Sequence, residues 1–293
     1  MIRASGAWGL AAALAVAGCA ATASWPSLDD DPAAVARLIA VRARHVRIVY
    51  LGESHDNPYH HMNQARVLEA MLAGGARPAL AFEMLAQDQQ PAVDEAMLEA
   101  ADPAAVGKRL RWVERRWPDF EMYRPLFDLA RRYGLPVVAI DLDQPLVRRI
   151  AKDGLGALPA GERSGLASRL APDADRERGI ARDIEASHCG LLEAAAVPAM
   201  VDAWHARNVT MARRILQALD RAPQVVAIVG RGHQAPGGLA DQVEALRPGT
   251  SQLAVDFVEV EGEEPDQAPR GNHIVWPTPP VERPDPCAPL RNR

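Results

Sequence analysis

Two carboxylates and two imidazoles occur at corresponding places in this chain, each at or just after the end of an apolar segment. Glu53 and His55 follow one such segment, Glu83 follows a second, and His233 follows a later one. A carboxylate beside an imidazole can exchange protons with a reacting group, and both groups ligate divalent metals. The pattern therefore predicts catalytic roles for these four residues if the protein is an enzyme, with a divalent metal as an open alternative.

The apolar segments are typical of β-strands. They lie at residues 45–51, 78–82, 135–140, 224–229 and 252–258, and residues 273–276 could add an edge strand. Three of them are apolar almost throughout, as in strands buried on both faces. Helical stretches lie between them and are longest at 87–132 and 146–220. We predict a three-layer α/β fold with a mainly parallel sheet, helices on both faces and helical insertions.

In such a sheet the carboxyl ends of the strands share one edge, and ligands bind there. Asp141 and Asp143 follow the third strand and belong to the same edge. A single carboxylate after a strand usually caps the next helix, and this is our interpretation of both. Four strands that each end in a carboxylate or an imidazole favour a shared site at this carboxyl edge.

The segment after the first strand has helix signals at both ends. Asn57 and Pro58 predict a helix start, and Gly74 with its neighbouring glycine predicts the end. His61 lies on the apolar stripe of this helix, one turn from its start, whereas His60 is expected to point elsewhere. His61 is therefore either a core residue or a ligand of the site, and both interpretations stay open.

The fourth strand ends in Gly230-Arg231-Gly232-His233. Glycines at this place can turn backbone N–H groups toward a ligand, or they can simply form a tight turn. The spacing does not match a dinucleotide-binding or Walker A motif. Asn208 interrupts the apolar stripe of a helix expected at 198–219, so it either satisfies a backbone group or reaches the site.

The N-terminus has the features of an export signal. An apolar run at 7–17 is too short to span a bilayer, and Val16-Ala17-Gly18-Cys19 resembles a lipobox. We expect a lipoprotein signal peptide at 1–18, lipidation of Cys19 and a linker at 19–31; an ordinary secretory signal is the alternative. The lipid would anchor the protein in the bacterial envelope, at the outer membrane in a Gram-negative cell.

Charge and cysteine content argue against nucleic-acid binding and against two kinds of cysteine site. The formal charge is −5, so no basic excess supports nucleic-acid binding. No Cys-x-x-Cys pair exists to form a thiolate zinc site or a thioredoxin-type site. Cys189 and Cys287 form either a disulfide or two free thiols, and the sequence leaves this open. Beyond Pro277 the chain is rich in proline and charge, so we expect a disordered tail at 278–293.

Several motifs together resemble the ChaN-like haem-binding lipoproteins over roughly residues 45–277. They are Leu51-Gly52-Glu53-Ser54-His55-Asp56-Asn57 with His60-His61, Phe82-Glu83-Met84, the segment 117–125, His188-Cys189-Gly190, Met211-Ala212 and Gly230-Arg231-Gly232-His233. The resemblance implies one such domain over 32–277. In the wider superfamily, with Tiki proteases and erythromycin esterases, paired Glu and His residues share a sheet edge; here these are Glu53, His55, Glu83 and His233. Asn208 and the segment 234–238 depart from the pattern.

The resemblance implies haem binding at a cell surface, in iron and haem acquisition, and a homodimer is plausible because a second subunit could supply a ligand. Ferric haem accepts Tyr or His ligands. Tyr59 and Tyr123 are the candidate tyrosines, and His61 and Arg231 complete the candidate set, with Arg231 placed to pair a propionate. The alternatives are a hydrolase that uses Glu53 or Glu83 as general base and an inert envelope scaffold.

Overall fold

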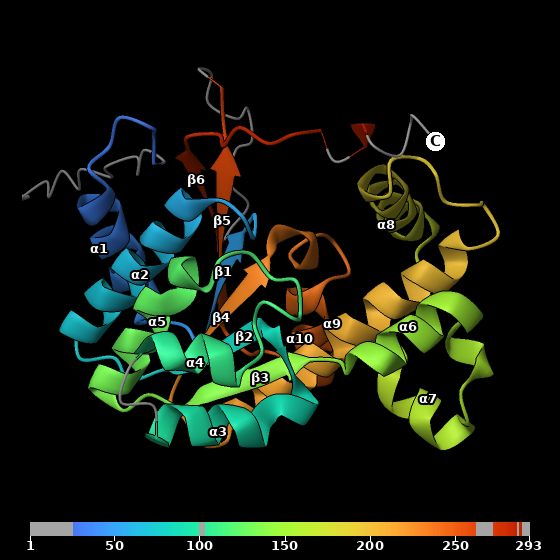
Figure 1. Cartoon of the computed structure of the whole chain (residues 1–293), viewed down its shortest axis with the longest axis horizontal. Coiled ribbons are helices and arrows are strands. Elements are labelled where there is room, and N and C mark those ends of the chain that lie inside the picture. Colours follow the sequence, from blue (N-terminus) through green and yellow to red (C-terminus); the bar gives the residue numbers. More distant parts are fainter. Residues whose placement is uncertain (1–25, 100–102, 262–271, 286, 289–293) are drawn as a thin grey trace, which may run out of the picture.

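The computed structural model describes residues 26–99, 103–261, 272–285 and 287–288. These ranges form a six-stranded sheet in the order β3-β2-β4-β1-β5-β6, with helices on both faces (Figure 1). All its pairings are parallel. The strands are β1 (Ile48–Glu53), β2 (Ala79–Ala86), β3 (Val137–Asp141), β4 (Val225–Gly230), β5 (Gln252–Glu259) and β6 (His273–Thr278). The predicted α/β class and parallel sheet are confirmed.

The two faces of the sheet pack against different helices. Val49 and Leu51 of β1 face the layer of α1 (Pro32–Ala43), α2 (Pro58–Ala73) and α5 (Phe120–Tyr133). Ile48 and Tyr50 face the opposite layer, formed by α9 (Val197–Leu219) and α10 (Leu239–Leu246). Successive side chains of a strand point to opposite faces, so a central strand covered on both sides must be apolar at every position.

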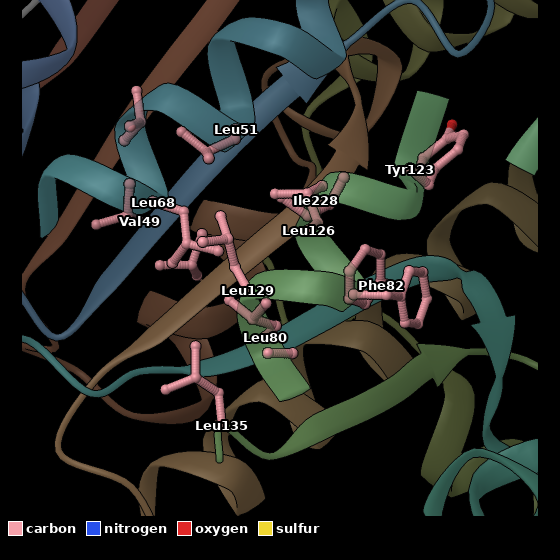
Figure 2. Close-up of a cluster of buried hydrophobic side chains, with 14 of the residues drawn as sticks. Val49, Leu51, Leu68, Leu80, Phe82, Tyr123, Leu126, Leu129, Leu135 and Ile228 are labelled. Atoms are coloured by element: carbon pink, nitrogen blue, oxygen red, sulfur yellow. The ribbon is translucent and has the colours of Figure 1, made fainter. Parts of the chain in front are cut away.

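Figure 2 shows the larger of these cores, with side chains of β1, β2 and β4 directed at α2 and α5. Phe82 stacks on Phe127 with ring centroids 4.7 Å apart. Tyr123 lies at the end of this core nearest the carboxyl edge, and its ring contacts Trp112 at 4.8 Å. The apolar core thus holds one side of the candidate site rigidly.

The helical insertions extend the fold beyond the sheet. Between β2 and α5 lie α3 (Gln90–Glu99) and α4 (Pro103–Arg109) with the short 3₁₀ turn η1 (Gln87–Gln89). Between β3 and α9 lie α6 (Gln144–Asp153), η2 (Leu155–Ala157), α7 (Ala160–Leu166) and α8 (Ala174–Ser187). A third small core, with Ile150 and Ala206 among its members, joins α6 to α9. Among the described residues, no helix is long and apolar enough to cross a membrane.

The prediction of a disordered tail from residue 278 is wrong for the part of the tail that the structure describes. Thr278 is the last residue of β6, and Arg283 forms ion pairs with Asp56 and Glu259, each at 2.6 Å. The hydrogen bond from Arg283, which outweighs the effect of burial, lowers the pKa of Glu259 to about 2. These pairings join segments far apart in sequence, so composition alone did not reveal them.

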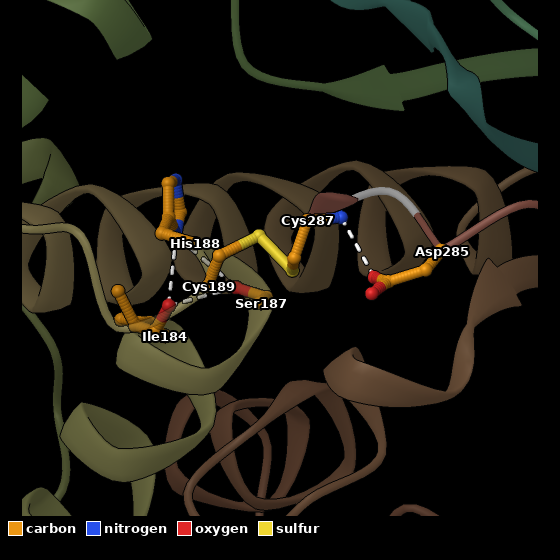
Figure 3. Close-up of a disulfide and its surroundings, with 6 residues drawn as sticks. All are labelled: Ile184, Ser187, His188, Cys189, Asp285 and Cys287. Carbon is orange, nitrogen blue, oxygen red and sulfur yellow. Dashed lines mark hydrogen bonds between the residues drawn. A yellow bond between two sulfur atoms is a disulfide. The ribbon is translucent and has the colours of Figure 1, made fainter. Parts of the chain in front are cut away.

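Cys189 and Cys287 form a disulfide, which decides between the two alternatives that the sequence left open (Figure 3). The bond joins the end of α8 to the C-terminal segment across 98 positions of sequence. A cross-link of this length restricts the unfolded chain strongly.

We expect the Cys189→Ser/Cys287→Ser double variant to lose roughly 2–4 kcal/mol of unfolding free energy, because its unfolded chain regains the entropy of an open loop. Urea unfolding of chains that begin at Ala20 measures this loss. Dithiothreitol should destabilise the wild type by a similar amount and leave the double variant unchanged. Equal unfolding midpoints for wild type and double variant would contradict the prediction.

Candidate functional site

The four residues predicted to share the carboxyl edge lie together. Glu53 accepts a hydrogen bond from His55 Nδ1 at 2.8 Å. Glu83 Oε1 lies 3.2 Å from His233 Nε2 and 3.8 Å from His55 Nε2. The sheet order places β4 between β1 and β2, and Glu53 is aligned with Gly230, so neighbouring strands bring these groups to one place. We call these four residues the Glu/His cluster.

Both oxygens of the Glu53 carboxylate are occupied by donors. Oε1 accepts from the Tyr123 hydroxyl at 2.6 Å as well as from His55. Oε2 accepts from Gln64 Nε2 at 2.5 Å and faces His61 Nδ1 at 3.3 Å. Burial raises the pKa of Glu53, but the charge of His61 and the hydrogen bond from His55 outweigh burial and lower it. Glu53 is thus a buried carboxylate with little capacity to take a proton.

Glu83 has a similar environment that the sequence revealed only in part. Its Oε1 accepts from Arg207 at 2.8 Å, and its Oε2 accepts from the backbone N–H of Gly230 at 2.6 Å. Burial raises the pKa of Glu83, but the charges of His233, His55 and Arg207 outweigh burial and hold it well below its usual value. Glu83 lies within β2 and not after it, because that strand continues to Ala86.

Arg207 is the residue of this site that the sequence analysis missed. Its guanidinium binds both oxygens of Asp141, at 2.9 Å from Nε and 2.8 Å from Nη2, and also reaches Glu83. Asp141 is therefore not the helix cap that we expected. Asp143 does occupy the cap position of α6, but its side chain makes no capping bond there and accepts from the backbone of Asp88 at 3.2 Å.

Position 230 needs a glycine because the side chains of His55 and Glu83 lie very close to its backbone. A Cβ on this residue would lie 2.8 Å from His55 Nε2 and 3.4 Å from a Glu83 oxygen. Its backbone N–H is directed at Glu83, so the glycine serves the cluster itself as well as the turn into η3 (Arg231–His233).

His233 is oriented by Asn208. Asn208 donates from Nδ2 to the Trp204 carbonyl at 2.8 Å, and its Oδ1 lies 3.1 Å from His233 Nδ1. Both interpretations left open for Asn208 are therefore true: it satisfies a backbone group and it reaches the site. A cavity of about 210 Å³ between α8, α9 and η3 reaches His233 and Trp204.

His55 is the most exposed member of the cluster, with 30% of its side chain open to solvent. Trp117 packs against its ring edge-on, with centroids 5.0 Å apart. Burial lowers the pKa of His55, but the charges of Glu83 and Glu53 and the hydrogen bond to Glu53 raise it to about 9. His55 is therefore a cation and a proton donor near neutral pH.

An NMR titration of the His55 ring should show a midpoint near pH 9, with a His55→Gln variant to assign the signal. Because this folded-state pKa lies above the usual 6.5, the contribution of His55 to stability is full below about pH 6.5 and is lost as pH rises through about 9. The contributions of Glu53 and Glu83 to stability depend on pH in the opposite sense. Because their folded-state pKa values are lowered, these contributions are lost as pH falls. A His55 midpoint at 6.5 would contradict this electrostatic account.

His60 and His61 are both buried, and they point to different places, as the sequence predicts: His61 faces Glu53, whereas His60 faces Thr278. His60 Nδ1 accepts from the backbone N–H of Ser54 at 2.8 Å, and Nε2 donates to Thr278 Oγ1 at 2.9 Å. Burial lowers the pKa of His60 to about 4, so the ring is neutral. It holds the loop after β1 against β6, an interaction that helical periodicity could not predict.

The candidate haem ligands differ sharply in accessibility. Tyr123 and His61 are fully buried; the hydroxyl of Tyr123 donates to Glu53, and His61 lies 2.9 Å from the His55 carbonyl and faces Glu53. Burial, reinforced by the charge of Glu53, raises the pKa of Tyr123 far above its usual value. Tyr59 is 40% exposed near the start of α2, and Arg231 is exposed on η3.

Among the described residues, no three His, Cys, Asp or Glu side chains are placed to hold a metal ion.

Comparison with known proteins gives one family. The family described as "Haem-binding uptake, Tiki superfamily, ChaN" matches residues 39–243, more than half of the chain. No curated protein matches the sequence.

Comparison with solved structures finds several similar chains, and ChaN of Campylobacter jejuni shares the fold. ChaN of Campylobacter jejuni, whose structure is described as cofacial haem binding, has 18% identity and a TM-score of 0.60, with 77% of this chain and 86% of that chain covered. The type III effector HopBA1 has 17% identity and a TM-score of 0.46, with 86% and 94% covered. An erythromycin esterase in its open conformation has 13% identity and a TM-score of 0.43, with 78% and 76% covered.

Proposed function

The chain belongs to the haem-binding uptake family of the Tiki superfamily, ChaN, and from this membership we propose that it binds haem in an iron or haem acquisition role. The family match over residues 39–243 is the observation that carries the proposal. The match includes Tyr59, His61, Tyr123 and Arg231, all the residues that sequence analysis selected as haem contacts.

We assign the iron ligand to Tyr59. A ligand must reach the iron without dismantling the core, and the side chain of Tyr59 is exposed with no hydrogen-bond partner for its hydroxyl among the described residues. Tyr123 and His61 do not meet this requirement, because both are buried and bound to Glu53 and its neighbours. Phenolate oxygen is an established haem ligand in proteins.

A second copy of the chain would complete the haem site. A ligand on an exposed helix contacts one face of the porphyrin and leaves the other face in water. ChaN of Campylobacter jejuni is described as binding haem cofacially, and we extend this arrangement to a homodimer of the present chain. Arg231, exposed on η3, would pair a propionate by a charge-assisted hydrogen bond.

The N-terminal sequence supports a location at the cell envelope. Lipidation of Cys19 after removal of residues 1–18 would tether the protein to the envelope membrane, where haem from outside the cell is captured. The Cys189–Cys287 disulfide supports export, since disulfides persist in oxidising compartments. Residues 1–25 lie outside the described part of the chain.

A hydrolase is the second candidate, and the partly exposed His55 next to two carboxylates is the observation that favours it. In that case His55 would act as the acid, and Glu53 and Glu83 would hold the charges around it, because their lowered pKa values make them weak bases. A hydrolase would lose turnover in a His55→Gln variant while still binding its substrate.

The test is a haemin titration of the chain that begins at Ala20, followed through the Soret band. We expect a saturable shift with one haemin per chain. A spectrum no different from that of an unrelated control protein at equal concentration would remove the haem proposal and leave the hydrolase to be tested on ester and peptide substrates.

A further inference from the structure

A second hollow lies beside the Glu/His cluster and is lined by basic side chains. It has a volume of about 800 Å³ and opens between the end of α4, the α4–α5 connection and the start of α6 (Figure 1 locates these helices). Its arginines are Arg109, Arg111, Arg115, Arg116 and Arg148. We call it the arginine pocket. A volume of this size suits a small molecule.

Most of these guanidinium groups form no ion pair or hydrogen bond with other described residues. Within the described part of the chain, no ion pair or side-chain hydrogen bond holds the guanidiniums of Arg111, Arg115, Arg116 and Arg148; Arg109 reaches Glu95 at 3.5 Å. This contrasts with Arg207 and Arg283, each of which binds two carboxylates.

The two carboxylates in the same wall, Asp88 and Glu114, do not balance five arginines. Like charges gathered in one hollow repel each other, and an anion bound among them relieves that repulsion. A planar guanidinium also binds phosphate and carboxylate oxygens two at a time.

The backbone of the α4–α5 connection supports a binding role. Arg111 has a φ of 53° and Arg116 a φ of 63°, the left-handed conformation that residues other than glycine rarely adopt. Among the described non-glycine residues, only Cys189 shares it. Such conformations cost free energy and cluster at functional sites. Here both strained residues line the same pocket.

The pocket adjoins the Glu/His cluster at one place and the network of Arg207 and Asp141 at another. Trp117 lines the pocket and packs against the ring of His55. Arg115 lies within electrostatic reach of Asp141, the partner of Arg207: burial lowers the pKa of Arg115, and the charges of Asp88 and Asp141 oppose this effect. A molecule in the pocket would therefore contact Trp117 next to the most exposed residue of the cluster.

We propose that the arginine pocket binds a small polyanion, a molecule with two or more phosphate or carboxylate groups, on the guanidiniums of Arg111, Arg115, Arg116 and Arg148. The proposal does not depend on haem binding and assigns a site apart from the Tyr59 ligand. The same chemistry could come from a phosphorylated small molecule or from the paired carboxylates of a porphyrin.

Calorimetric titration with inorganic pyrophosphate and with metal-free protoporphyrin IX, at about 150 mM salt, tests the proposal and separates the two sources. The Arg115→Gln/Arg148→Gln variant of the chain from Ala20 should bind the effective probe at least about tenfold more weakly, since it lacks two charge-assisted contacts. The Arg132→Gln/Arg182→Gln variant loses the same charge from exposed positions outside the pocket and should bind like the wild type.

Binding of pyrophosphate alone identifies phosphate chemistry, and binding of protoporphyrin alone identifies the porphyrin carboxylates; either supports the pocket if only the pocket variant weakens it. A charge-reversing Arg148→Glu variant should weaken binding further. The proposal is overturned if neither probe binds the wild type, or if the pocket and control variants lose affinity equally. A protein that binds pyrophosphate but not haemin would keep this inference and refute the proposed function.

Discussion

A Tyr59→Phe variant of the chain from Ala20 should bind haemin at least about tenfold more weakly than the wild type, a loss of about 1.4 kcal/mol or more of binding free energy. The substitution removes one oxygen from an exposed side chain, so the fold should be unaffected. The iron loses its phenolate ligand, and the Soret band should move toward that of haem without a protein oxygen ligand. A Soret titration measures both effects.

Two further tyrosines supply the controls. Tyr133 is exposed to a similar extent, 38% against 40% for Tyr59, but it ends α5, at the opposite end of that helix from the carboxyl edge. Tyr133→Phe should bind haemin normally. Tyr123→Phe should keep the Soret band but lower stability, because Glu53 loses a hydrogen bond in the core. Loss of haemin binding in Tyr123→Phe with normal binding in Tyr59→Phe would contradict the assignment.

An Arg207→Gln variant should be the most destabilised single variant of the carboxyl edge, by about 3–5 kcal/mol. Its guanidinium bridges Glu83 and Asp141, both buried, so removal leaves two carboxylates close together without their shared cation. The arginine pKa is raised by the charges of Asp141 and Glu83 even though burial alone would lower it. Urea unfolding at neutral pH measures the loss.

The matched control is Arg149→Gln, which removes an exposed ion pair with Glu162 and should cost less than about 1 kcal/mol. Adding Asp141→Asn to Arg207→Gln should recover part of the lost stability, because one unpaired buried charge disappears. If the Arg207 and Arg149 variants unfold at the same urea concentration, the buried network does not stabilise the fold as argued.

The sequence predicted the strands because their apolar character is a local property. Ile48 to Leu51 and Val225 to Val229 are apolar at every position, and the structure buries these residues on both faces of the sheet. The helix start at Asn57 was equally local: its side chain accepts from the backbone of Tyr59 and His60, as a cap should. Because parallel strands align their carboxyl ends, the Glu/His cluster followed from these assignments.

The parts of the site that the sequence did not predict depend on contacts between distant segments. Arg207 meets Asp141 across 66 positions, and His60 meets Thr278 across 218. The local sequence around Arg207 or His60 contains nothing that identifies these distant partners. Helical periodicity singled out Asn208, because this polar residue lies on an otherwise apolar stripe. Arg207 lies outside that stripe, where a charged residue is typical of a solvent-facing position, so periodicity did not single it out.

The carboxyl edge therefore combines a rigid buried network with exposed groups around it. Glu53 and Glu83 accept hydrogen bonds from several donors each, and this fixes the positions of His55, His233 and Arg207. Exposed side chains around this network are the ones that can contact a ligand. Among them, Tyr59 is proposed to bind the haem iron and Arg231 to pair a propionate. Buried charges that hold one another in place are a common means of positioning a site.

Native mass spectrometry of the chain from Ala20, mixed with one equivalent of haemin, tests the central claim most directly. The account predicts that haem remains bound at one group per chain and that the haem-bearing species contains two chains. If haem is found on single chains, the proposal of haem binding stands and the proposal of a homodimer is refuted. A spectrum that contains only haem-free protein would contradict the claim that this chain binds haem.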